Sequence, residues 1–139
     1  MEILDFSTFR PQQCISSKVM RLNRVIANIF RKHLQPFGVT DSQLSLLFIL
    51  SKTKDRNQKQ LSEMAVLEKS SLHRNLKRLL AADLIVSDHA RKINITEKGK
   101  LLVSAIIPEW EKAMKEAAQL LQPDGLDALG VLLVKISSK

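Results

Sequence analysis

Ten consecutive residues, Lys69 to Arg78, combine short polar side chains with long cationic ones and include no acidic residue. Four of the ten carry a formal positive charge, namely Lys69, Arg74, Lys77 and Arg78. Apolar residues follow a helical spacing through and just beyond this stretch, at Leu72, Leu76, Leu79 and Leu80. This periodicity predicts a helix with one buried apolar face and one polar, cationic face.

Such a face has the chemistry needed to bind a nucleic-acid duplex. Hydroxyl, imidazole and guanidinium groups can bond to base edges in the major groove, and cations neutralise phosphates. A helix N-terminus also attracts phosphate through its free N–H groups. The predicted DNA contacts on this helix are Lys69, Ser70, Ser71, His73, Arg74, Lys77 and Arg78. A following hairpin would bring Arg91 and Lys92 to the adjacent minor groove or its phosphates.

The surrounding pattern predicts the elements that position this helix. Apolar spacing, capping residues and proline or glycine breaks predict helices over about 15–34, 41–51, 58–66, 69–82 and 97–121, and a last helix from Pro123. Pro108 is expected to kink the long helix or break its hydrogen-bond ladder. Short β-type runs at 84–86 and 93–96 predict a hairpin with its tip at 87–92. The order helix, break, helix, hairpin indicates a mainly α fold, the winged helix-turn-helix.

Composition excludes several other classes of protein. The 139 residues fit one domain, and 45% hydrophobic and 26% charged residues are typical of a globular chain. There is neither an apolar run of membrane-spanning length nor a signal-peptide pattern, and the single cysteine suits a reducing compartment, so we expect a cytoplasmic protein without a membrane partner. No catalytic, cofactor-binding or metal-binding motif is visible in the sequence, which argues against an enzyme.

The charge distribution points to the same part of the chain. Lys and Arg number 22 and Asp and Glu number 14, so the net charge is +8. Residues 1–54 contribute +5, residues 55–100 contribute +4 and residues 101–139 contribute −1. The positive field is therefore concentrated in the first two thirds of the chain, which favours a polyanionic partner.

The segment from Gln60 to Leu79, QLSEMAVLEKSSLHRNLKRL, resembles the helix-turn-helix of the multiple antibiotic resistance regulator (MarR) family. Ile95-Thr96-Glu97-Lys98-Gly99 is similar to the segment that begins the helix after the wing in that family. The chain departs from the family pattern at Val66, where glycine is frequent, and at Ser62, where alanine is usual. The segment 87–92 is also shorter than the usual wing.

The resemblance implies a homodimeric transcriptional regulator, expected to be a repressor, that binds double-stranded DNA at a palindromic operator and is released by a small-molecule inducer. We expect one MarR-like domain over 1–139, with the winged helix-turn-helix at 36–100 and dimerisation helices at 12–35 and 101–139. These helices carry more apolar surface than one small domain can bury, and a second copy of the chain would bury the remainder. The predicted dimerisation residues are Ile15, Val19, Leu22, Trp110, Leu126, Leu129, Leu132, Leu133 and Ile136. Trp110 could equally be a core residue of its own chain.

Two alternatives stay open at this stage. Cys14 lies near the start of the first helix, where a thiol pKa can fall, and the resembled family includes peroxide sensors with a cysteine in this region. The chain has no tyrosine to serve as the hydrogen-bond partner of such a sensor, although Arg10 and Lys18 could supply positive charge. The second alternative is a wing-domain module that binds another protein.

Overall fold

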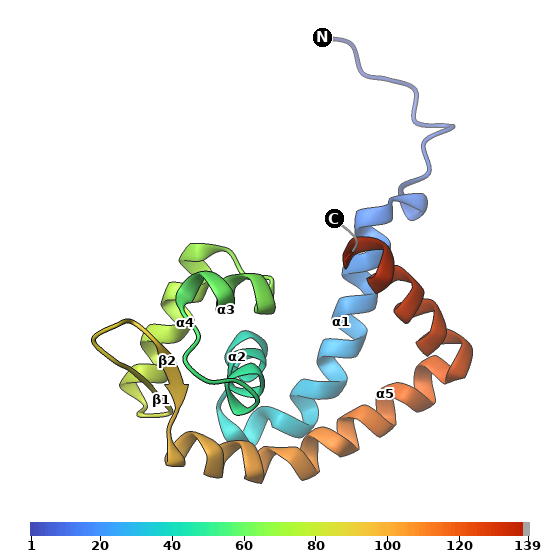
Figure 1. Cartoon of the computed structure of the whole chain (residues 1–139). Helices are drawn as coiled ribbons and strands as arrows, with labels where there is room; N and C mark the ends of the chain where they lie inside the picture. Colours follow the sequence, from blue (N-terminus) through green and yellow to red (C-terminus); the bar gives the residue numbers. More distant parts are fainter. Residues whose placement is uncertain (138–139) are drawn as a thin grey trace.

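A computed structural model describes residues 1–137 of the chain, so Ser138 and Lys139, the end of the expected range 101–139, lie outside the described residues. Figure 1 shows a helical molecule with one small hairpin. The elements in chain order are η1 (Pro11–Gln13), α1 (Ile15–Leu34), η2 (Gln35–Phe37), α2 (Asp41–Ser51), α3 (Gln58–Ala65), α4 (Lys69–Ala81), β1 (Ile85–Ser87), β2 (Ile93–Ile95) and α5 (Glu97–Ser137). The expected mainly α fold with a β-hairpin is confirmed.

Helices α2 and α3 begin with reciprocal caps that the sequence encodes. The Thr40 hydroxyl accepts a hydrogen bond from the Gln43 N–H, and the Gln43 side chain accepts one from the Thr40 N–H. Asn57 and Gln60 repeat this arrangement at the start of α3. Each box satisfies N–H groups that would otherwise lack a partner at the helix end. These caps fix where α2 and α3 begin.

A tight turn between α3 and α4 sets the angle between the two helices. The Leu67 N–H donates to the Ser62 carbonyl (3.0 Å) and the Val66 N–H to the Glu63 carbonyl (3.4 Å), which is a Schellman arrangement. Val66 occupies its left-handed position, with φ of 52°, although glycine suits that conformation better. The Ser62 hydroxyl donates to the Leu67 carbonyl (2.5 Å). Val66 and Ser62, the two residues that depart from the family pattern, therefore lie in the same turn. The hydrogen bond from Ser62 to Leu67 spans the strained residue Val66.

The hydrophobic core lies behind this turn, and α2 runs through its centre. Leu46, Leu47 and Leu50 of α2 are at most 1% exposed. They pack in one cluster with buried residues of α3, α4, the hairpin and α5, which are Leu61, Leu72, Leu76, Leu79, Leu84, Ile85, Ile93 and Val103. Burial of each large aliphatic side chain contributes about 1.5–3 kcal/mol to stability. The core thus holds the helix-turn-helix and the hairpin together as one unit.

The hairpin joins α5 through a crowded contact at Gly99. β1 and β2 pair antiparallel, with Ile85 opposite Ile95, and the Thr96 N–H donates to the Leu84 carbonyl (3.1 Å). A Cβ atom at Gly99 would collide with the Leu84 carbonyl oxygen and lie 2.6 Å from Ile95 Cγ1. Gly99 therefore has to be a glycine, because at this point α5 lies directly against the Leu84 carbonyl, just before β1.

The long C-terminal helix breaks once within the described residues. Gln122 has φ of 63° and ψ of 171°, and helix resumes at Pro123, as the sequence predicted. The dihedral angles at Pro108 stay helical, so α5 continues through that proline and loses only the hydrogen bond that proline cannot donate. Below the break α5 runs beneath the core, and above it the chain turns back alongside the region of α1 in the view of Figure 1. No helix among residues 1–137 is long and apolar enough to cross a membrane.

Replacement of Gly99 by alanine tests the contact between the hairpin and α5. We expect Gly99→Ala to lower the free energy of unfolding by about 2–3 kcal/mol, because the new methyl group forces β1 and α5 apart. Gly130→Ala is the matched control, since nothing lies within 4 Å of its added Cβ. Chemical denaturation followed by circular dichroism measures both variants. Equal stability of Gly99→Ala and the wild type would contradict the crowding.

Replacement of Val66 by glycine tests the strain in the turn. A non-glycine residue in the left-handed region destabilises the folded state by about 1–2 kcal/mol. Replacement by glycine removes this strain, but glycine also makes the unfolded chain more flexible, which offsets part of the stabilisation. We therefore expect Val66→Gly to raise the free energy of unfolding by about 0.5–1 kcal/mol. Val66→Ala keeps a Cβ atom at the same backbone angles and should give a much smaller gain. A loss of stability in Val66→Gly would show that the turn is not strained.

Candidate nucleic-acid interface

The polar face of α4 is open to solvent along its whole length. Leu72, Leu76 and Leu79 are at most 3% exposed on the opposite face. Exposed side chains on the polar face include the predicted contacts Lys69, Ser70, His73, Arg74, Lys77 and Arg78. Ser71 differs, because it is half-buried at the edge of this face. The structure therefore brings six of the seven helix residues singled out from the sequence onto one accessible surface.

The cations of this face are electrostatically uncompensated. Within residues 1–137, Lys69, Arg74, Lys77 and Arg78 form no ion pair, whereas Arg31, Lys32, Lys100 and Lys112 each have an acidic partner. Glu68, at the N-cap of α4, makes no side-chain capping bond. The N–H groups of the first turn, which carry a partial positive charge, are thus left without a side-chain cap. Both features raise the affinity of this surface for phosphate.

Hydrogen bonds at its C-terminal end hold α4 in place. The Lys98 ammonium donates to the Ala82 carbonyl (2.9 Å), where the negative end of the helix dipole favours a cation. The buried Asn75 side chain donates to the Ser71 carbonyl (2.8 Å) within the helix. Thr96 ties the residues after α4 to α5 by donating its hydroxyl to the Asp83 carbonyl (2.6 Å). The bonds from Lys98 and Thr96 join the end of α4 to the start of α5, which helps to keep the polar face of α4 turned outward.

Two grooves flank α4 and extend the surface to its neighbours. One, of about 280 Å³, lies between His73 and Lys77 of α4 and Ser87 and Ile93 of the hairpin. The other, of about 680 Å³, lies beside Lys69, Ser70, His73 and Arg74. Gln58 of α3 lines both. Sequence reasoning missed Gln58 as a contact, although its place in the first turn of the helix that precedes α4 was a usable signal.

A third groove, of about 630 Å³, contains three cations from three elements. It is lined by Lys59 of α3, Lys69 of α4 and Arg91 of the hairpin tip. Arg91 has φ of 60° in a loop closed by Asp88, whose carbonyl accepts from the Arg91 N–H (2.9 Å) and whose carboxylate accepts from the Lys92 N–H (2.9 Å). The short wing thus brings Arg91 to the start of α3 and α4, and Lys92 is exposed. Lys59 is a second residue that sequence reasoning did not name.

The sequence of this region matches a known family. Residues 37–92 match the sequence model of the MarR family. The chain is therefore similar to the MarR family over this segment. The matched residues include α2, α3, α4, β1 and the hairpin tip, and β2 follows directly after them. A search of curated protein sequences finds no match.

Solved MarR-type structures share the fold over nearly the whole chain. The transcriptional repressor CouR bound to p-coumaroyl-CoA has 19% identity and a TM-score of 0.84 over 97% of this chain and 99% of its own. BpsR of Bordetella bronchiseptica, whose DNA binding is regulated by 6-hydroxynicotinic acid, has 20% identity and a TM-score of 0.81 over 94% and 98%. The Mycobacterium tuberculosis regulator MosR has 21% identity and a TM-score of 0.78 over 97% and 100%. Structures of CouR and MosR with DNA are also similar. All three named neighbours are described as regulators of transcription or as proteins with regulated DNA binding.

The residues predicted to form a dimer lie outside the MarR-family segment, and almost all are exposed. On α1, Ile15 is 80% and Val19 60% exposed, and Leu22 is exposed too. On the last part of α5 the exposed apolar side chains include Leu126, Leu129, Leu132, Leu133 and Ile136. Trp110 differs, because it is half-buried and its ring packs edge-on against Phe48 of the same chain, with centroids 5.7 Å apart. Trp110 therefore packs on its own chain, and its contribution to a dimer stays a prediction.

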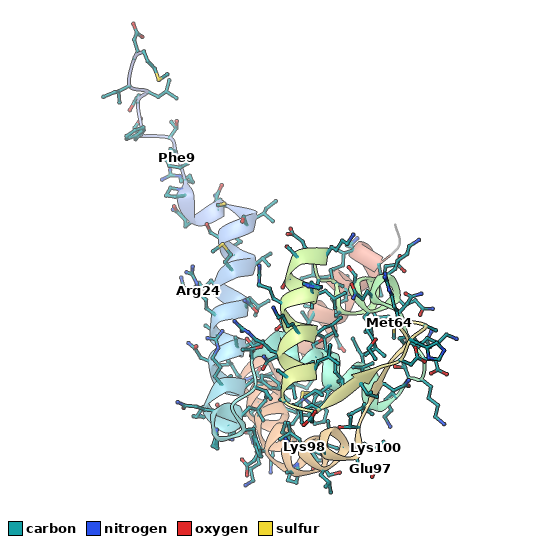
Figure 2. The ribbon with its side chains drawn as sticks, turned by 90° about the vertical axis from the view of Figure 1, so that its left-hand side faces the viewer. Phe9, Arg24, Met64, Glu97, Lys98 and Lys100 are labelled. Atoms are coloured by element: carbon teal, nitrogen blue, oxygen red, sulfur yellow. The ribbon has the colours of Figure 1, made fainter. Side chains whose placement is uncertain are left out.

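A pocket of about 470 Å³ lies where α1 and α5 meet the helix-turn-helix. Its lining is largely apolar and aromatic: Ile26, Ala27 and Phe30 from α1, Leu44 and Phe48 from α2, Met64 from α3 and Trp110 from α5. Asn23, Ser45 and Asp41 add polar groups. Met64 is one of the labelled side chains of Figure 2. A concave apolar site with a few polar groups is typical of small-molecule binding.

Charged side chains tie α1 to α5 beside this pocket. The Lys32 ammonium lies 2.6 Å from a Glu116 carboxylate oxygen, and the His33 ring lies between Glu116 (3.4 Å) and Glu109 (3.7 Å). The hydrogen bond from Lys32 lowers the pKa of Glu116, and the one from Lys112 lowers the pKa of Glu109. The His33 side chain is only 19% exposed between these groups. The Lys32–Glu116 pair joins α1 to α5, whereas the Lys112–Glu109 pair lies within α5.

Cys14 is exposed and is not part of a disulfide. It precedes α1, and hydrogen bonds from the Ser17 hydroxyl and then the Ser17 N–H lower the pKa of its thiol. Neither Arg10 nor Lys18 contributes to this shift. The setting therefore has one feature of a reactive cysteine, a stabilised thiolate, and lacks the neighbouring positive charge that the sequence suggested. No group of three or more potential metal ligands is present among residues 1–137.

Proposed function

We propose that this chain is a homodimeric transcriptional repressor that binds a palindromic operator through α4. The observation that carries the proposal is the outward face of α4, where four cations without acidic partners lie over a fully buried leucine face. A DNA major groove is wide enough for a helix and lined by phosphates. A DNA target also supports the expectation that the protein acts in the cytoplasm.

The residues of this face suit two kinds of contact. Ser70, His73 and Arg74, in the first half of α4, can reach base edges when the helix N-terminus enters the groove. Lys77 and Arg78 lie further along and suit phosphate oxygens, whose contacts position the protein without reading sequence. Lys59, Lys69 and Arg91, which line one groove, suit the phosphates that flank the recognition helix. Arg91 would then contribute affinity more than sequence preference.

The homodimer is supported by the apolar surface that one chain leaves uncovered on α1 and α5. In a two-fold dimer that buries this surface, the two α4 helices would enter successive major grooves about 34 Å apart. The operator would share the two-fold symmetry of the protein, so its sequence would be a palindrome. A repressor role follows if the bound dimer covers the promoter.

The inducer is supported by the pocket at the junction of α1, α2 and α5. Its aromatic and aliphatic lining suits a planar apolar or aromatic molecule, with polar groups at Asn23, Ser45 and Asp41 to hold a substituent. A ligand there contacts both the helices that would form the dimer and the helix-turn-helix. If the ligand binds more tightly to a dimer with one spacing of the α4 helices than to a dimer with another, its binding favours the first spacing. DNA is released only if the favoured spacing does not fit the operator.

The DNA-binding face is tested by selecting bound sequences from random duplexes and then measuring variants on the enriched site. We expect an enriched palindrome. Arg74→Ala should weaken binding by about 1–3 kcal/mol and relax preference at one base pair in each half-site. Lys77→Ala should weaken all sequences alike and flatten the salt dependence by about one phosphate per subunit. Fluorescence anisotropy at several fixed salt concentrations measures both.

Lys115→Ala is the control for the loss of one exposed positive charge, since Lys115 lies on α5 away from the α4 face. Its effect on operator affinity should be small. Unchanged affinity in both Arg74→Ala and Lys77→Ala would rule out α4 as the recognition helix. Weak binding to all DNA, with no enriched sequence, would instead favour a wing-domain module that binds another protein.

The pocket is tested through Trp110, the only tryptophan of the chain, which lines it. Titration with 6-hydroxynicotinic acid or p-coumaroyl-CoA, named with two of the structural neighbours, should quench Trp110 fluorescence in a saturable manner. Asn23→Phe, at the pocket, should abolish this response, and Asn28→Phe, on α1 outside it, should keep it. A response that survives Asn23→Phe, or a flat titration with both compounds, would count against an aromatic ligand in this pocket.

A further inference from the structure

A second cavity adjoins the apolar pocket of α1, α2 and α5, which we call the junction pocket. The second cavity, which we call the outer groove, has a volume of about 570 Å³. Leu34, Asp41 and Leu44 line both cavities, so the two share a boundary. The remaining lining of the outer groove is more polar and consists of Arg31, Gln35, Val39 and Thr40. A molecule with one apolar part and one polar part suits such a pair of cavities.

The charged side chains of the two cavities meet at this boundary. Among residues 1–137, Asp41 is the one charged residue that lines the junction pocket, and Arg31 is the one cation that lines the outer groove. Arg31 Nη2 lies 3.3 Å from Asp41 Oδ2, and Arg31 Nη1 donates to the side-chain oxygen of Asn28 (3.2 Å). These bonds use two of the five N–H groups of the guanidinium. The other donors are available to a further acceptor.

The contact between Arg31 and Asp41 is easily replaced. Charge-assisted N–H···O bonds are usually about 2.7–2.9 Å long, and this contact is longer. Both side chains are 60% exposed, and exposed ion pairs are individually weak. Asp41 also lies in the first turn of α2, where the helix dipole stabilises a negative charge without Arg31. The neighbouring cation Lys32 differs, because it lies 2.6 and 2.8 Å from the two carboxylate oxygens of Glu116.

The junction pocket contains no group that would hold an anion. Phe30, Phe48 and Trp110 line it with aromatic rings, and the carboxylate of Asp41 repels a second negative charge. A charge in apolar surroundings is unfavourable unless it is paired. A carboxylate on a bound molecule is therefore favoured only at the boundary with the outer groove, where Arg31 can pair with it.

We propose that the junction pocket and the outer groove form one binding site for an amphipathic carboxylate, and that Arg31 recognises its charge. The apolar part of the ligand lies in the junction pocket, and its carboxylate replaces Asp41 on the guanidinium, whose fork of N–H groups suits two carboxylate oxygens. The inference rests on the ligand pocket of the proposed function and adds the class of ligand. Arg31 is a specificity-determining residue, because it contacts the group that distinguishes an acid from its uncharged analogue.

The charge preference is tested with phenylacetic, 3-phenylpropanoic and 4-phenylbutanoic acids and with the amide of each acid. An acid and its amide have the same ring and tail, and only the acid is charged at neutral pH. The three tails place the carboxylate at different distances from the ring. Isothermal titration calorimetry on the full chain measures each affinity. We expect at least one acid to bind at least tenfold more tightly than its amide, because only the acid forms a charge-assisted pair with Arg31.

The role of Arg31 is tested with substitutions on both sides of the ion pair. Arg31→Gln should weaken binding of the preferred acid at least tenfold and leave binding of its amide unchanged. Asp41→Asn should strengthen binding of the acid about threefold or more, because Arg31 loses its competing partner and the repulsion from Asp41 disappears. Arg24→Gln is the matched control, since Arg24 is an exposed arginine of α1 that lines neither cavity and is labelled in Figure 2. It should bind acid and amide like the wild type.

The outcomes separate this inference from the proposed function. A preference for the acid that is lost in Arg31→Gln and increased in Asp41→Asn supports the inference. Equal affinity of the wild type for acid and amide, or an Arg31→Gln variant that binds both less tightly by the same factor, overturns it and leaves the apolar pocket standing. Tighter binding of 3-phenylpropylamine than of the acids also overturns it, because Asp41 would then select the charge. No binding of any probe counts against the junction pocket as a ligand site and so against both proposals.

Discussion

The amphipathic division of α4 is the constraint on which the rest of the structure depends. Leu72, Leu76 and Leu79 are buried against the leucines of α2 and together contribute about 5–9 kcal/mol. If the helix rotated by half a turn, these side chains would be exposed and four unpaired cations would enter the core, where each unpaired charge costs several kcal/mol. One rotation of α4 is therefore strongly favoured. The cationic face points outward because the apolar face of the same helix is more stable when it is buried in the core.

The turn before α4 shows how a locally unfavourable choice can be kept. Val66 holds a left-handed conformation that a β-branched residue rarely adopts. The Schellman bonds at Val66 and Leu67 and the added bond from the Ser62 hydroxyl over-determine that conformation. Leu61 and Leu72, buried on either side of the turn, fix the helices that it joins. The contacts that set the angle between α3 and α4 thus also offset the energetic cost of the strained conformation at Val66.

Much of this architecture is predictable because its causes are local in the sequence. Helix starts at Asp41 and Gln58 follow from capping boxes, the restart at Pro123 from the ring of proline, and the outward face of α4 from the spacing of leucines. Contacts between distant segments are not encoded in any local pattern. His33 lies more than 75 residues from its partners Glu109 and Glu116 in the sequence, so the spacing of residues along α1 cannot reveal their contact. The approach of Arg91 to Lys59 likewise depends on the positive φ of a loop residue that is not glycine.

The two surfaces proposed here lie in different parts of the molecule. The cationic face belongs to the compact unit built on α2, whereas the uncovered apolar residues lie on α1 and the end of α5, which reach away from that unit (Figure 1). The two parts are joined by a second hydrophobic cluster, in which Leu34 of α1, Leu44 of α2 and Ile106 of α5 are buried together. The exposed Arg31–Asp41 pair adds little to this connection, because exposed ion pairs are individually weak. A molecule that occupies the apolar pocket at this junction would contact side chains that pack on the cluster, such as Phe30, Phe48 and Trp110. A small change of angle there would be carried, through the rigid helix-turn-helix, into the position of α4.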